Sequence, residues 1–188
     1  MLVVLSGLPG VGKSAVAAAL ANRLSAVHLS IDPVEDALLA AGLPAGWQTG
    51  VAAYEATRAS AELNLAQGRV VVVDAVNDSE PARSTWRTAA DRTSASLAFV
   101  HLTCSDEAEH RRRLEGRVRG FGRLPEPTWP QVVERMASYE PWSAGDCVVV
   151  DTGRALPLVV DEVERRLRER GVAGGKSPVT GDDRSRGR

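Results

Sequence analysis

A phosphate-binding pattern stands near the start of the chain. Residues 7–14 read GLPGVGKS and fit the pattern G-x-x-x-x-G-K-[ST] completely. Glycines let a backbone wrap closely around phosphate, and the N-terminus of a following helix adds partial positive charge. We expect Lys13 to reach the β- and γ-phosphates of a nucleotide and Ser14 to ligate Mg²⁺. The alternative is a tight glycine turn that binds nothing. The residues predicted to surround the phosphates are Gly7, Leu8, Pro9, Gly10, Val11, Gly12, Lys13 and Ser14.

Two aspartates follow apolar segments and could act on a transferred group. Asp74 comes directly after the valines at 70–73, and a carboxylate there can hold the water shell of Mg²⁺. Alternatively, it simply ends the strand. Asp32 follows the apolar residues 27–31 and could accept the proton of an attacking hydroxyl group. The segment 32–35 (DPVE) also fits a helix N-cap with proline at N1 and glutamate at N3, and the two roles are compatible.

Basic residues gather at 110–123. Six arginines stand there against one acid, Glu115, so the local charge is +6 − 1 = +5. Arg113 and Arg117 are four residues apart, which places them on one face of a predicted helix. A mobile lid carrying such arginines could neutralise charge on a transferring phosphoryl group, with Arg117 the first candidate and Arg113 the second. A solvated helix face, offset by the acids at 106–109, is the alternative.

Three further residues could contact an acceptor molecule. Glu35 could accept hydrogen bonds from hydroxyl or amino groups, although helix capping explains it equally well. Trp47 and Tyr54 could stack on a ring-bearing substrate, or they could fill the core.

The histidines and cysteines show no metal-binding pattern. His28, His101 and His110 are not spaced as metal ligands with Cys104 and Cys147. His28 and His101 lie within predicted strands, so we expect them to pack in the core, and His110 should be a solvated helix residue. Two cysteines are too few for a disulfide framework, which predicts a reducing, cytoplasmic environment.

Alternating strands and helices must position these residues. Apolar runs predict strands at 2–5, 27–31, 69–73, 97–102 and 147–150. Helical spacing and capping residues predict helices at 13–25, 32–41, 51–67, 79–92, 105–118, 130–138 and 156–170. The alternation indicates an α/β domain with a doubly wound, mainly parallel five-stranded sheet over residues 1–170. Such sheets bind ligands at the carboxyl ends of their strands.

Composition and length exclude several classes of protein. The 188 residues carry a formal net charge of −1, so the global basic field of nucleic-acid coating proteins is absent. No apolar run approaches the roughly 20 residues that cross a bilayer, and we expect no signal peptide or membrane contact. The only lysines are Lys13 and Lys176, which leaves no guanine-binding N-K-x-D motif. The chain also looks too short for an AAA+ module with its extra helical domain. Residues 171–188 lack apolar periodicity and are predicted to be a disordered tail.

Together, these motifs resemble those of P-loop kinases. The nearest named groups are the kinase domain of polynucleotide 5′-kinases and chloramphenicol phosphotransferase. The similarity is carried by the phosphate loop, Asp32, residues 71–77 (VVVDAVN), Arg83, Trp86 and residues 112–117 (RRLEGR). It implies a P-loop NTPase fold of the nucleotide-kinase type, with a helical, arginine-bearing lid at about 110–130.

The resemblance also implies cofactors and roles for residues. ATP would be the phosphoryl donor and Mg²⁺ its metal ion, with Asp32 as the base and Arg117 in the lid. The segment after the last strand, which includes Thr152, would hold adenine. Asn77 and Arg83 would lie near the acceptor.

One position departs from the pattern of polynucleotide 5′-kinases. They tend to have an arginine three residues after the catalytic aspartate, and this chain has Glu35. A carboxylate would repel an anionic backbone, so a nucleic-acid acceptor is disfavoured.

The leading hypothesis is an ATP-dependent phosphotransferase that moves the γ-phosphoryl group to a hydroxyl of a small molecule. Antibiotic, nucleoside and sugar-like acceptors are all open. A polynucleotide 5′-hydroxyl kinase is the first alternative. A non-catalytic ATP-binding regulatory module is an alternative of another class.

Overall fold

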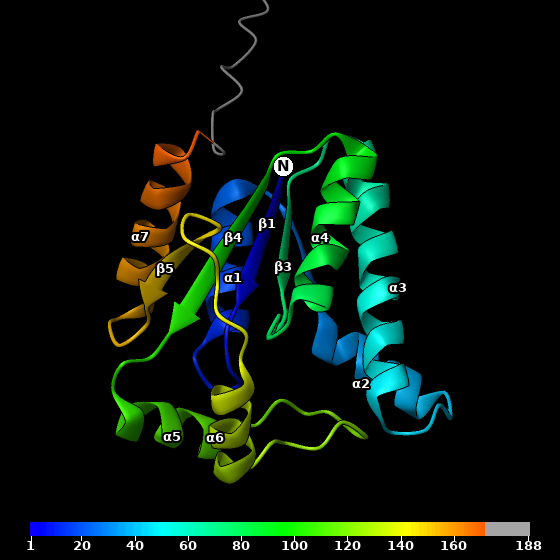
Figure 1. The fold of residues 1–188 in the computed structure, drawn as a ribbon, viewed down its shortest axis with the longest axis vertical. Coiled ribbons are helices and arrows are strands. Elements are labelled where there is room, and N and C mark those ends of the chain that lie inside the picture. Colours follow the sequence, from blue (N-terminus) through cyan, green and yellow to red (C-terminus); the bar gives the residue numbers. More distant parts are fainter. Residues whose placement is uncertain (172–188) are drawn as a thin grey trace, which may run out of the picture.

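Five parallel strands form a single sheet in the computed structural model, which describes residues 1–171 (Figure 1). The strand order is β2-β3-β1-β4-β5, and every neighbouring pair is parallel. The strands are β1 (Leu2–Ser6), β2 (Val27–Ser30), β3 (Val71–Asp74), β4 (Leu97–Thr103) and β5 (Cys147–Asp151). The predicted doubly wound α/β fold is confirmed. The predicted tail, apart from Gly171, lies outside the described residues.

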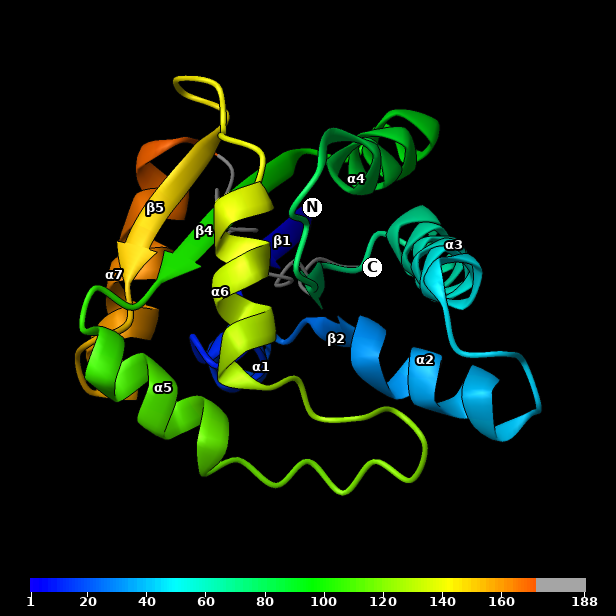
Figure 2. The ribbon, with the colours of Figure 1, turned by 60° about the horizontal axis from the view of Figure 1, so that its bottom comes forward.

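Helices cover both faces of this sheet (Figures 1 and 2). α1 and α7 pack on one face, while α3 and α4 pack on the other. The helices are α1 (Lys13–Leu24), α2 (Ile31–Ala40), α3 (Trp47–Ala66), α4 (Glu80–Thr93), α5 (Glu107–Glu115), α6 (Trp129–Ser138) and α7 (Leu156–Glu169). No helix within residues 1–171 has the length and apolarity needed to span a membrane.

The central strand β1 shows why the sheet is stable. All five of its residues are buried. Val3 and Leu5 join the core beneath α1 and α7, whereas Leu2 and Val4 join the core beneath α3 and α4. Side chains alternate between the two faces of a strand, so a continuous apolar run fits a strand covered on both sides. Each such side chain contributes about 1.5–3 kcal/mol on burial. The phosphate loop is therefore attached to the most buried strand.

The start of α2 differs from the predicted capping arrangement. α2 begins at Ile31, with Ser30 as its N-cap, and no side chain caps it. Asp32 therefore lies inside the first turn instead of at the N-cap. A carboxylate is still favourable there because the helix N-terminus carries partial positive charge. Its side chain makes no capping hydrogen bond and is free to contact another element.

The segment after α5 is not helical. α5 ends at Glu115, and residues 116–128, here called the arginine loop, form no helix or strand. Gly120 and two prolines, Pro125 and Pro127, lie in this loop and disfavour a helix. Figure 2 shows the loop running from α5 past α2 and back to α6. Arg113 and Arg117 therefore do not share a helix face, and the predicted lid is helical only at its two ends.

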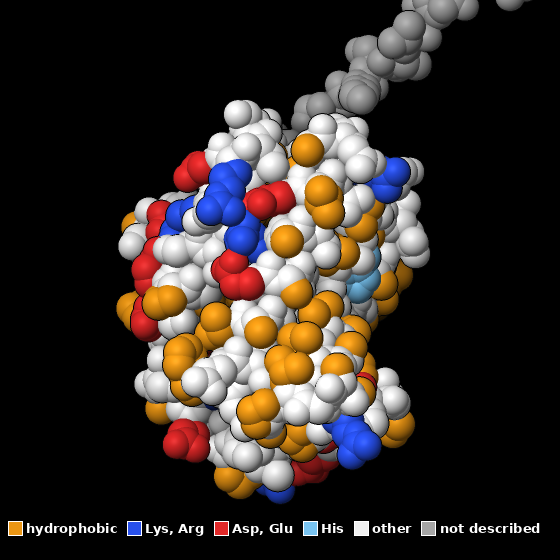
Figure 3. Space-filling model, turned by 90° about the vertical axis from the view of Figure 1, so that its right-hand side faces the viewer, with side chains coloured by type: hydrophobic (Ala, Val, Ile, Leu, Met, Phe, Trp, Pro, Cys, Tyr) orange, Lys and Arg blue, Asp and Glu red, His pale blue; other side chains and the backbone are white. Residues whose placement is uncertain are grey.

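Helices α3 and α4 form one broad side of the molecule (Figure 3). Hydrophobic side chains are spread over this side among charged ones. Leu43, Trp47, Val51 and Leu63 are the exposed large apolar residues of the α2–α3 connection and of α3. The Trp47 side chain is 77% exposed, so it contributes to this surface and not to the core.

Candidate active site

The phosphate loop connects β1 to α1 and depends on glycines with positive φ angles. Gly7 has a φ of +142°, and a Cβ atom there would lie 2.4 Å from the backbone oxygen of Leu102 in β4. Gly12 has a φ of +96° and is the N-cap of α1. The unpaired N–H groups of the first turn of α1 therefore face the loop, as an anion-binding site requires.

Lys13 folds back over this loop. Its Nζ donates a hydrogen bond to the backbone oxygen of Leu8 at 3.0 Å. Burial lowers the pKa of Lys13 to about 8, while the charges of Asp74 and Asp32 act in the opposite direction. A buried ammonium group whose hydrogen bond goes to a carbonyl oxygen gains strongly from an anionic partner.

Asp74 is the last residue of β3 and connects two other elements. Ser14 Oγ donates to Asp74 Oδ2 at 2.7 Å, and His28 Nε2 lies 2.7 Å from Asp74 Oδ1. Burial alone would raise the pKa of Asp74, but the hydrogen bonds from His28 and Ser14, together with nearby positive charge from Lys13, hold this pKa below its usual range. Asp74 is therefore a buried, ionised carboxylate directed at the first turn of α1.

Ser14 and Asp74 fit a magnesium site. Mg²⁺ prefers oxygen ligands and is usually bound by one or two protein groups together with substrate phosphates and water. A hydroxyl and a carboxylate 2.7 Å apart beside a phosphate loop match that donor set. Within residues 1–171, no group of three or more His, Cys, Asp or Glu side chains could hold a metal ion unaided.

A cavity of about 480 Å³ opens in front of the phosphate loop. Its walls come from that loop, the start of α1, α2, α5, the arginine loop and α6. The charged residues that line it are Lys13, Asp32, Glu35, Arg113, Arg117, Arg119 and Arg135. Five of these residues are basic and two are acidic, so the net charge of the wall is 5 − 2 = +3. Such a cavity attracts an anion.

Only part of the phosphate loop reaches this cavity. Pro9, Gly10 and Gly12 line it together with Lys13 and Ser14. The side chain of Val11 is buried in the core beneath α1, and Leu8 packs against the same core.

The arginine loop closes the cavity opposite the phosphate loop. Arg119 Nη1 forms an ion pair with Asp32 Oδ2. Glu126, from the same loop, pairs with Nε of Arg119 and with Nε of Arg117, each at 2.8 Å. The carboxylate predicted to act as a base is therefore held by a basic residue in this structure.

Arg117 is the least satisfied arginine of the cavity. Its Nε is held by Glu126, but its buried Nη2 donates no hydrogen bond to any group within residues 1–171. Burial, followed by the charge of Arg119, lowers the pKa of Arg117. Unpaired buried N–H groups are costly, so this guanidinium is suited to an anionic ligand.

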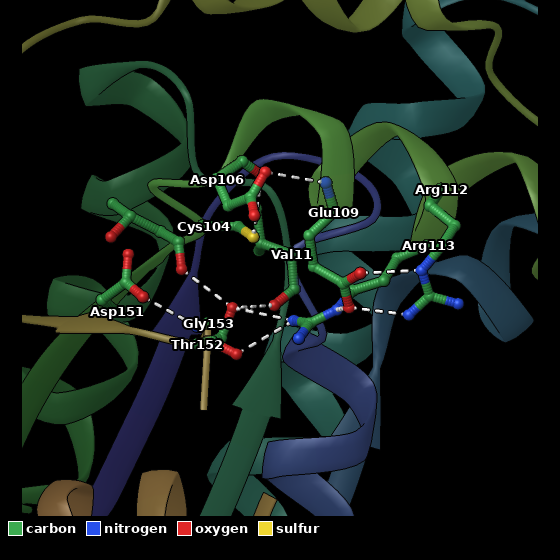
Figure 4. Close-up of polar contacts among 10 residues, drawn as sticks. Val11, Cys104, Asp106, Glu109, Arg112, Arg113, Asp151, Thr152 and Gly153 are labelled. Atoms are coloured by element: carbon green, nitrogen blue, oxygen red, sulfur yellow. Dashed lines mark hydrogen bonds and ion pairs between the residues drawn. The ribbon is translucent and has the colours of Figure 1, made fainter. Parts of the chain in front are cut away.

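Arg113 attaches α5 to the end of β5 (Figure 4). Its Nη1 donates to the backbone oxygen of Thr152 at 3.0 Å and to Thr152 Oγ1 at 3.2 Å. Thr152 Oγ1 also lies 2.8 Å from the backbone oxygens of Val11 and Thr103. Glu109 accepts a hydrogen bond from Arg113 Nε at 2.6 Å. Arg113 and Thr152 therefore meet at one edge of the phosphate loop.

His110 attaches α5 directly to the phosphate loop. It is only 2% exposed, and its Nε2 lies 2.7 Å from the backbone oxygen of Pro9. The ring of Trp129, at the start of α6, packs edge-on against it with 5.1 Å between ring centroids. The prediction that His110 is a solvated helix residue is wrong.

Glu35 lies one turn after Asp32 on the cavity side of α2. It is half-buried, and burial followed by the charge of Asp32 raises its pKa. A Cβ atom at Gly50 in α3 would lie 3.8 Å from Glu35 Oε1, so the carboxylate faces α3 across a narrow space. No capping contact involves Glu35, which removes the alternative explanation for it.

The structure places four of the predicted acceptor residues outside the cavity wall. Trp47 is on the surface of α3, and Tyr54 is a half-buried residue of α3 with its hydroxyl 3.2 Å from the backbone nitrogen of Asn77. The Asn77 side chain is fully buried and bonds to Ser6 and Trp86. These contacts hold the turn after β3, where Asn77 has a φ of +54°.

Arg83 also has a structural environment. It is 2% exposed, and its guanidinium donates to the backbone oxygens of Asn77, Glu140 and Pro141. It stacks on Trp142 with 3.9 Å between Cζ and the ring centroid. It therefore fastens α4 to the segment that follows α6.

Several residues of the site escaped the sequence analysis. His28 contacts Asp74 although it was predicted to be an ordinary core residue, and Arg119 contacts Asp32 although Arg117 and Arg113 ranked first. Asp36, Glu126 and Arg135 had no assigned part. The alternation of Arg117 and Arg119 in the sequence was a usable signal, because residues two apart point the same way in extended chain.

Comparisons with known proteins agree with this fold. The sequence model of the AAA domain family matches residues 2–141. A gluconokinase from Sinorhizobium meliloti 1021 is 22% identical with a TM-score of 0.63, covering 89% of this chain and 91% of that one. A sugar kinase from Janibacter sp. HTCC2649 is 18% identical with a TM-score of 0.68, covering 92% and 95%. The APS kinase of Mycobacterium tuberculosis, in complex with AMPPNP and APS, is 20% identical with a TM-score of 0.65, covering 89% and 96%.

None of the curated proteins is significantly similar to this chain in sequence. The narrower resemblance to polynucleotide 5′-kinases and chloramphenicol phosphotransferase stays a prediction. The matched residues run from β1 to the segment that follows α6 and include no extra helical domain, so the match leaves untested the argument that the chain is too short for an AAA+ module with such a domain. The chain has the fold of P-loop kinases, and it belongs to the AAA domain family.

Proposed function

We propose that the protein is an ATP-dependent kinase that phosphorylates a hydroxyl group of a small molecule. One observation carries the proposal. The phosphate loop, the Ser14–Asp74 pair, Asp32 and the cavity arginines all line or adjoin the same cavity. A phosphoryl-transfer enzyme needs these parts together: a grip on the phosphates, a metal site, an acceptor for the hydroxyl proton, and cations opposite the transferred group.

On the donor side, the chain supplies charge and backbone N–H groups. The glycines of the phosphate loop and the start of α1 bind the β- and γ-phosphates, and Lys13 moves from the Leu8 carbonyl to a phosphate oxygen. Magnesium held by Ser14, and by Asp74 through its water shell, would supply neutralisation of the terminal phosphates. Arg117, whose buried Nη2 has no hydrogen-bond partner within residues 1–171, binds the γ-phosphoryl oxygens. The adenine ring of ATP lies against Arg113 and Thr152.

On the acceptor side, Asp32 takes part in the transfer itself. The acceptor oxygen bonds to the γ-phosphorus as the bond to the β,γ-bridging oxygen breaks, the hydroxyl proton passes to the Asp32 carboxylate, and ADP leaves. Arg119 must first release Asp32, and the phosphates of bound ATP offer it a stronger anionic partner. Glu35 accepts hydrogen bonds from further hydroxyl or amino groups of the acceptor.

The acceptor class follows from the same wall of the cavity. Glu35 and Asp32 face the acceptor with two carboxyl groups, which favours a neutral or cationic polyol over a nucleic-acid strand. The names of two structural neighbours, a gluconokinase and a sugar kinase, support a sugar-like acceptor.

A turnover screen tests the proposal. The full chain is incubated with ATP, Mg²⁺ and a panel of sugars, nucleosides, aminoglycosides and other hydroxyl-bearing antibiotics, and phosphorylated product is detected by mass spectrometry. Asp32→Asn should lower kcat by about 10²–10⁴-fold, the usual contribution of a general base, while leaving ATP binding intact. Asp91→Asn is the matched control, because Asp91 is an exposed aspartate of α4. Parent-like turnover by Asp32→Asn would contradict the mechanism.

With a 5′-hydroxyl oligonucleotide added to the panel, two alternatives appear as distinct outcomes of that screen. Labelling of a 5′-hydroxyl oligonucleotide, with no small-molecule product, would indicate a polynucleotide kinase. Tight ATP binding without any phosphorylated product would indicate a non-catalytic regulatory module.

A further inference from the structure

Asp36 holds the arginine loop by its backbone. This carboxylate lies one turn after Asp32 on α2. Its Oδ1 accepts hydrogen bonds from the N–H groups of Arg123 and Leu124, each at 2.7 Å, and its Oδ2 accepts one from Gly122 at 3.3 Å. The backbone hydrogen bonds of Leu124 and Arg123 are the main reason why the pKa of Asp36 lies below its usual range. Three consecutive N–H groups around one anion form a specific attachment.

The arginine loop has little other support. Residues 116–128 contribute no helix or strand, so no regular backbone ladder fixes them. Glu126 pairs with Arg117 and Arg119, but all three belong to the loop and move with it. The remaining side-chain attachment to α2 is the Arg119–Asp32 pair.

The proposed reaction breaks the attachment at Asp32 but not the one at Asp36. Asp32 must give up Arg119 before it can accept a hydroxyl proton, so that attachment is lost during the proposed reaction. Asp36 does not line the cavity and contacts backbone, so nothing in the reaction competes for it. Because Asp32 and Asp36 are four residues apart, one helix face presents both carboxylates to the loop.

We infer that Asp36 is a positioning residue that keeps the arginine loop against α2 while Arg119 changes partner from Asp32 to a phosphate group. The role of the arginines toward phosphate rests on the proposed function, whereas the attachment of the loop does not. Asp36 touches neither donor nor acceptor. It acts through the loop, and its removal should weaken nucleotide binding by letting Arg117 and Arg119 leave the cavity.

Limited proteolysis measures the attachment without any substrate. Trypsin cuts after arginine, and the loop offers bonds after Arg117, Arg119 and Arg123. Cleavage of a transiently open segment follows the population of the open form when opening is fast. Asp36→Ala should raise the rate of loop cleavage, located by mass spectrometry, by about tenfold, since it removes charge-assisted hydrogen bonds. Asp36→Asn should give a smaller increase, because Oδ1 is kept. Asp91→Asn, the exposed control on α4, should match the parent.

Hydrogen exchange of the parent protein tests the same attachment without any variant, so the test does not depend on how well a variant folds. In the parent, the amides of Gly122, Arg123 and Leu124 should exchange more slowly than other amides of the loop, because they donate to Asp36. Exchange of all three at the free-peptide rate would overturn the inference. Equal loop cleavage in the parent and in Asp36→Ala would also overturn it.

A nucleotide titration separates this inference from the proposed function. With AMPPNP and Mg²⁺, Asp36→Ala should bind about tenfold more weakly than the parent, and its loop should stay more sensitive to trypsin when saturated. A parent that binds no nucleotide would contradict the proposed function and leave the proteolysis result standing. An open loop in Asp36→Ala with unchanged nucleotide affinity would overturn the positioning role.

Discussion

The two sides of the cavity are built in different ways. The phosphate side is backbone attached to the sheet, where Gly7 lies directly against β4 and Asp74 ends β3 with contacts to Ser14 and His28. The arginine side is an irregular loop, and side chains of α2 hold it from outside. Close packing therefore fixes the conformation of the phosphate loop. The arginine loop is held by side-chain contacts that a ligand can replace.

This difference fits the chemistry of each side. A phosphate grip gains from a rigid, preorganised backbone, because no reorganisation is then needed at the moment of reaction. The arginine loop must move to let nucleotide and acceptor enter the cavity, so a segment of low local stability suits this role. Arg119 shows the consequence, since it holds Asp32 here and must release it for transfer.

Among the residues of the arginine side, the largest effect is expected for Arg119, and Arg111 on the surface of α5 is its control. Arg119→Ala should lower kcat by about 10²–10³-fold, the usual cost of losing one donor to a transition-state charge. Arg111→Ala should leave kcat close to that of the parent, because Arg111 pairs with Glu115 on the surface of α5. Steady-state kinetics with an acceptor from the screen measures both. Equal losses in the two variants would show that general charge near the site, and not the position of Arg119, is responsible.

Glycine substitutions compare the rigidity of the two sides directly. Gly7→Ala places a Cβ atom 2.4 Å from the Leu102 oxygen at a positive φ, so the free energy of unfolding should fall by roughly 2–4 kcal/mol. Gly120→Ala in the arginine loop also has a positive φ, +70°, but meets no atom within 4 Å, and should cost only about 1 kcal/mol. Urea denaturation measures both. Similar losses would mean that the phosphate loop can shift as easily as the arginine loop.

His110 tests whether α5 belongs with the rigid side. His110→Ala removes a buried ring and leaves the Pro9 oxygen without its partner, so the free energy of unfolding should fall by roughly 1–3 kcal/mol. Weaker nucleotide binding should accompany the loss, because the phosphate loop is released at Pro9. Thermal unfolding and nucleotide titration check the two effects. A destabilised variant with parent-like nucleotide affinity would show that His110 supports the fold alone.

The smallest expected effect is a response of the arginine loop to acid. Backbone hydrogen bonds from Leu124 and Arg123 hold the pKa of Asp36, which attaches the loop to α2, below its ordinary 3.8. A carboxyl with a lowered pKa in the folded state stabilises that state above its ordinary pKa, and the stabilisation is lost as pH falls through the lowered value.

The loop should therefore stay closed at neutral pH and open below about pH 4, before the sheet unfolds. Hydrogen exchange of residues 122–124 between pH 3 and 7, corrected for intrinsic rates, measures this change. In Asp36→Asn the dependence on pH should be weaker. A loop that exchanges equally at pH 3 and 7 in the parent would contradict the assignment.

The sequence was sufficient to predict the features that depend on the parallel sheet. The valines of β1 and β3 predicted buried parallel strands, and the glycine pattern at 7–14 predicted the phosphate loop between β1 and α1. Asp74 followed because strand ends in a parallel sheet share one edge. Each of these features depends on residues close together in the chain, or on a sheet rule that needs no side-chain detail.

The sequence was insufficient where distant side chains meet. Arg119 and Asp32 are 87 residues apart, and His28 and Asp74 are 46 apart. No spacing rule links such pairs, so composition suggested a lid but not which arginine turns inward. Arg83 and Asn77 also carry charge or amide groups typical of a binding site, yet their hydrogen bonds go to backbone and to Trp86. Both side chains are buried in the folded protein, and the local sequence around a polar residue does not show whether it is buried.

The central claim is that the phosphate loop grips a nucleotide through Lys13, and isothermal titration with AMPPNP and Mg²⁺ tests it most directly. The parent should show saturable binding of one nucleotide per chain, and Lys13→Met, which keeps the side-chain length without the charge, should bind at least about tenfold more weakly. Absence of binding to the parent, or equal affinity in the two proteins, would contradict the account.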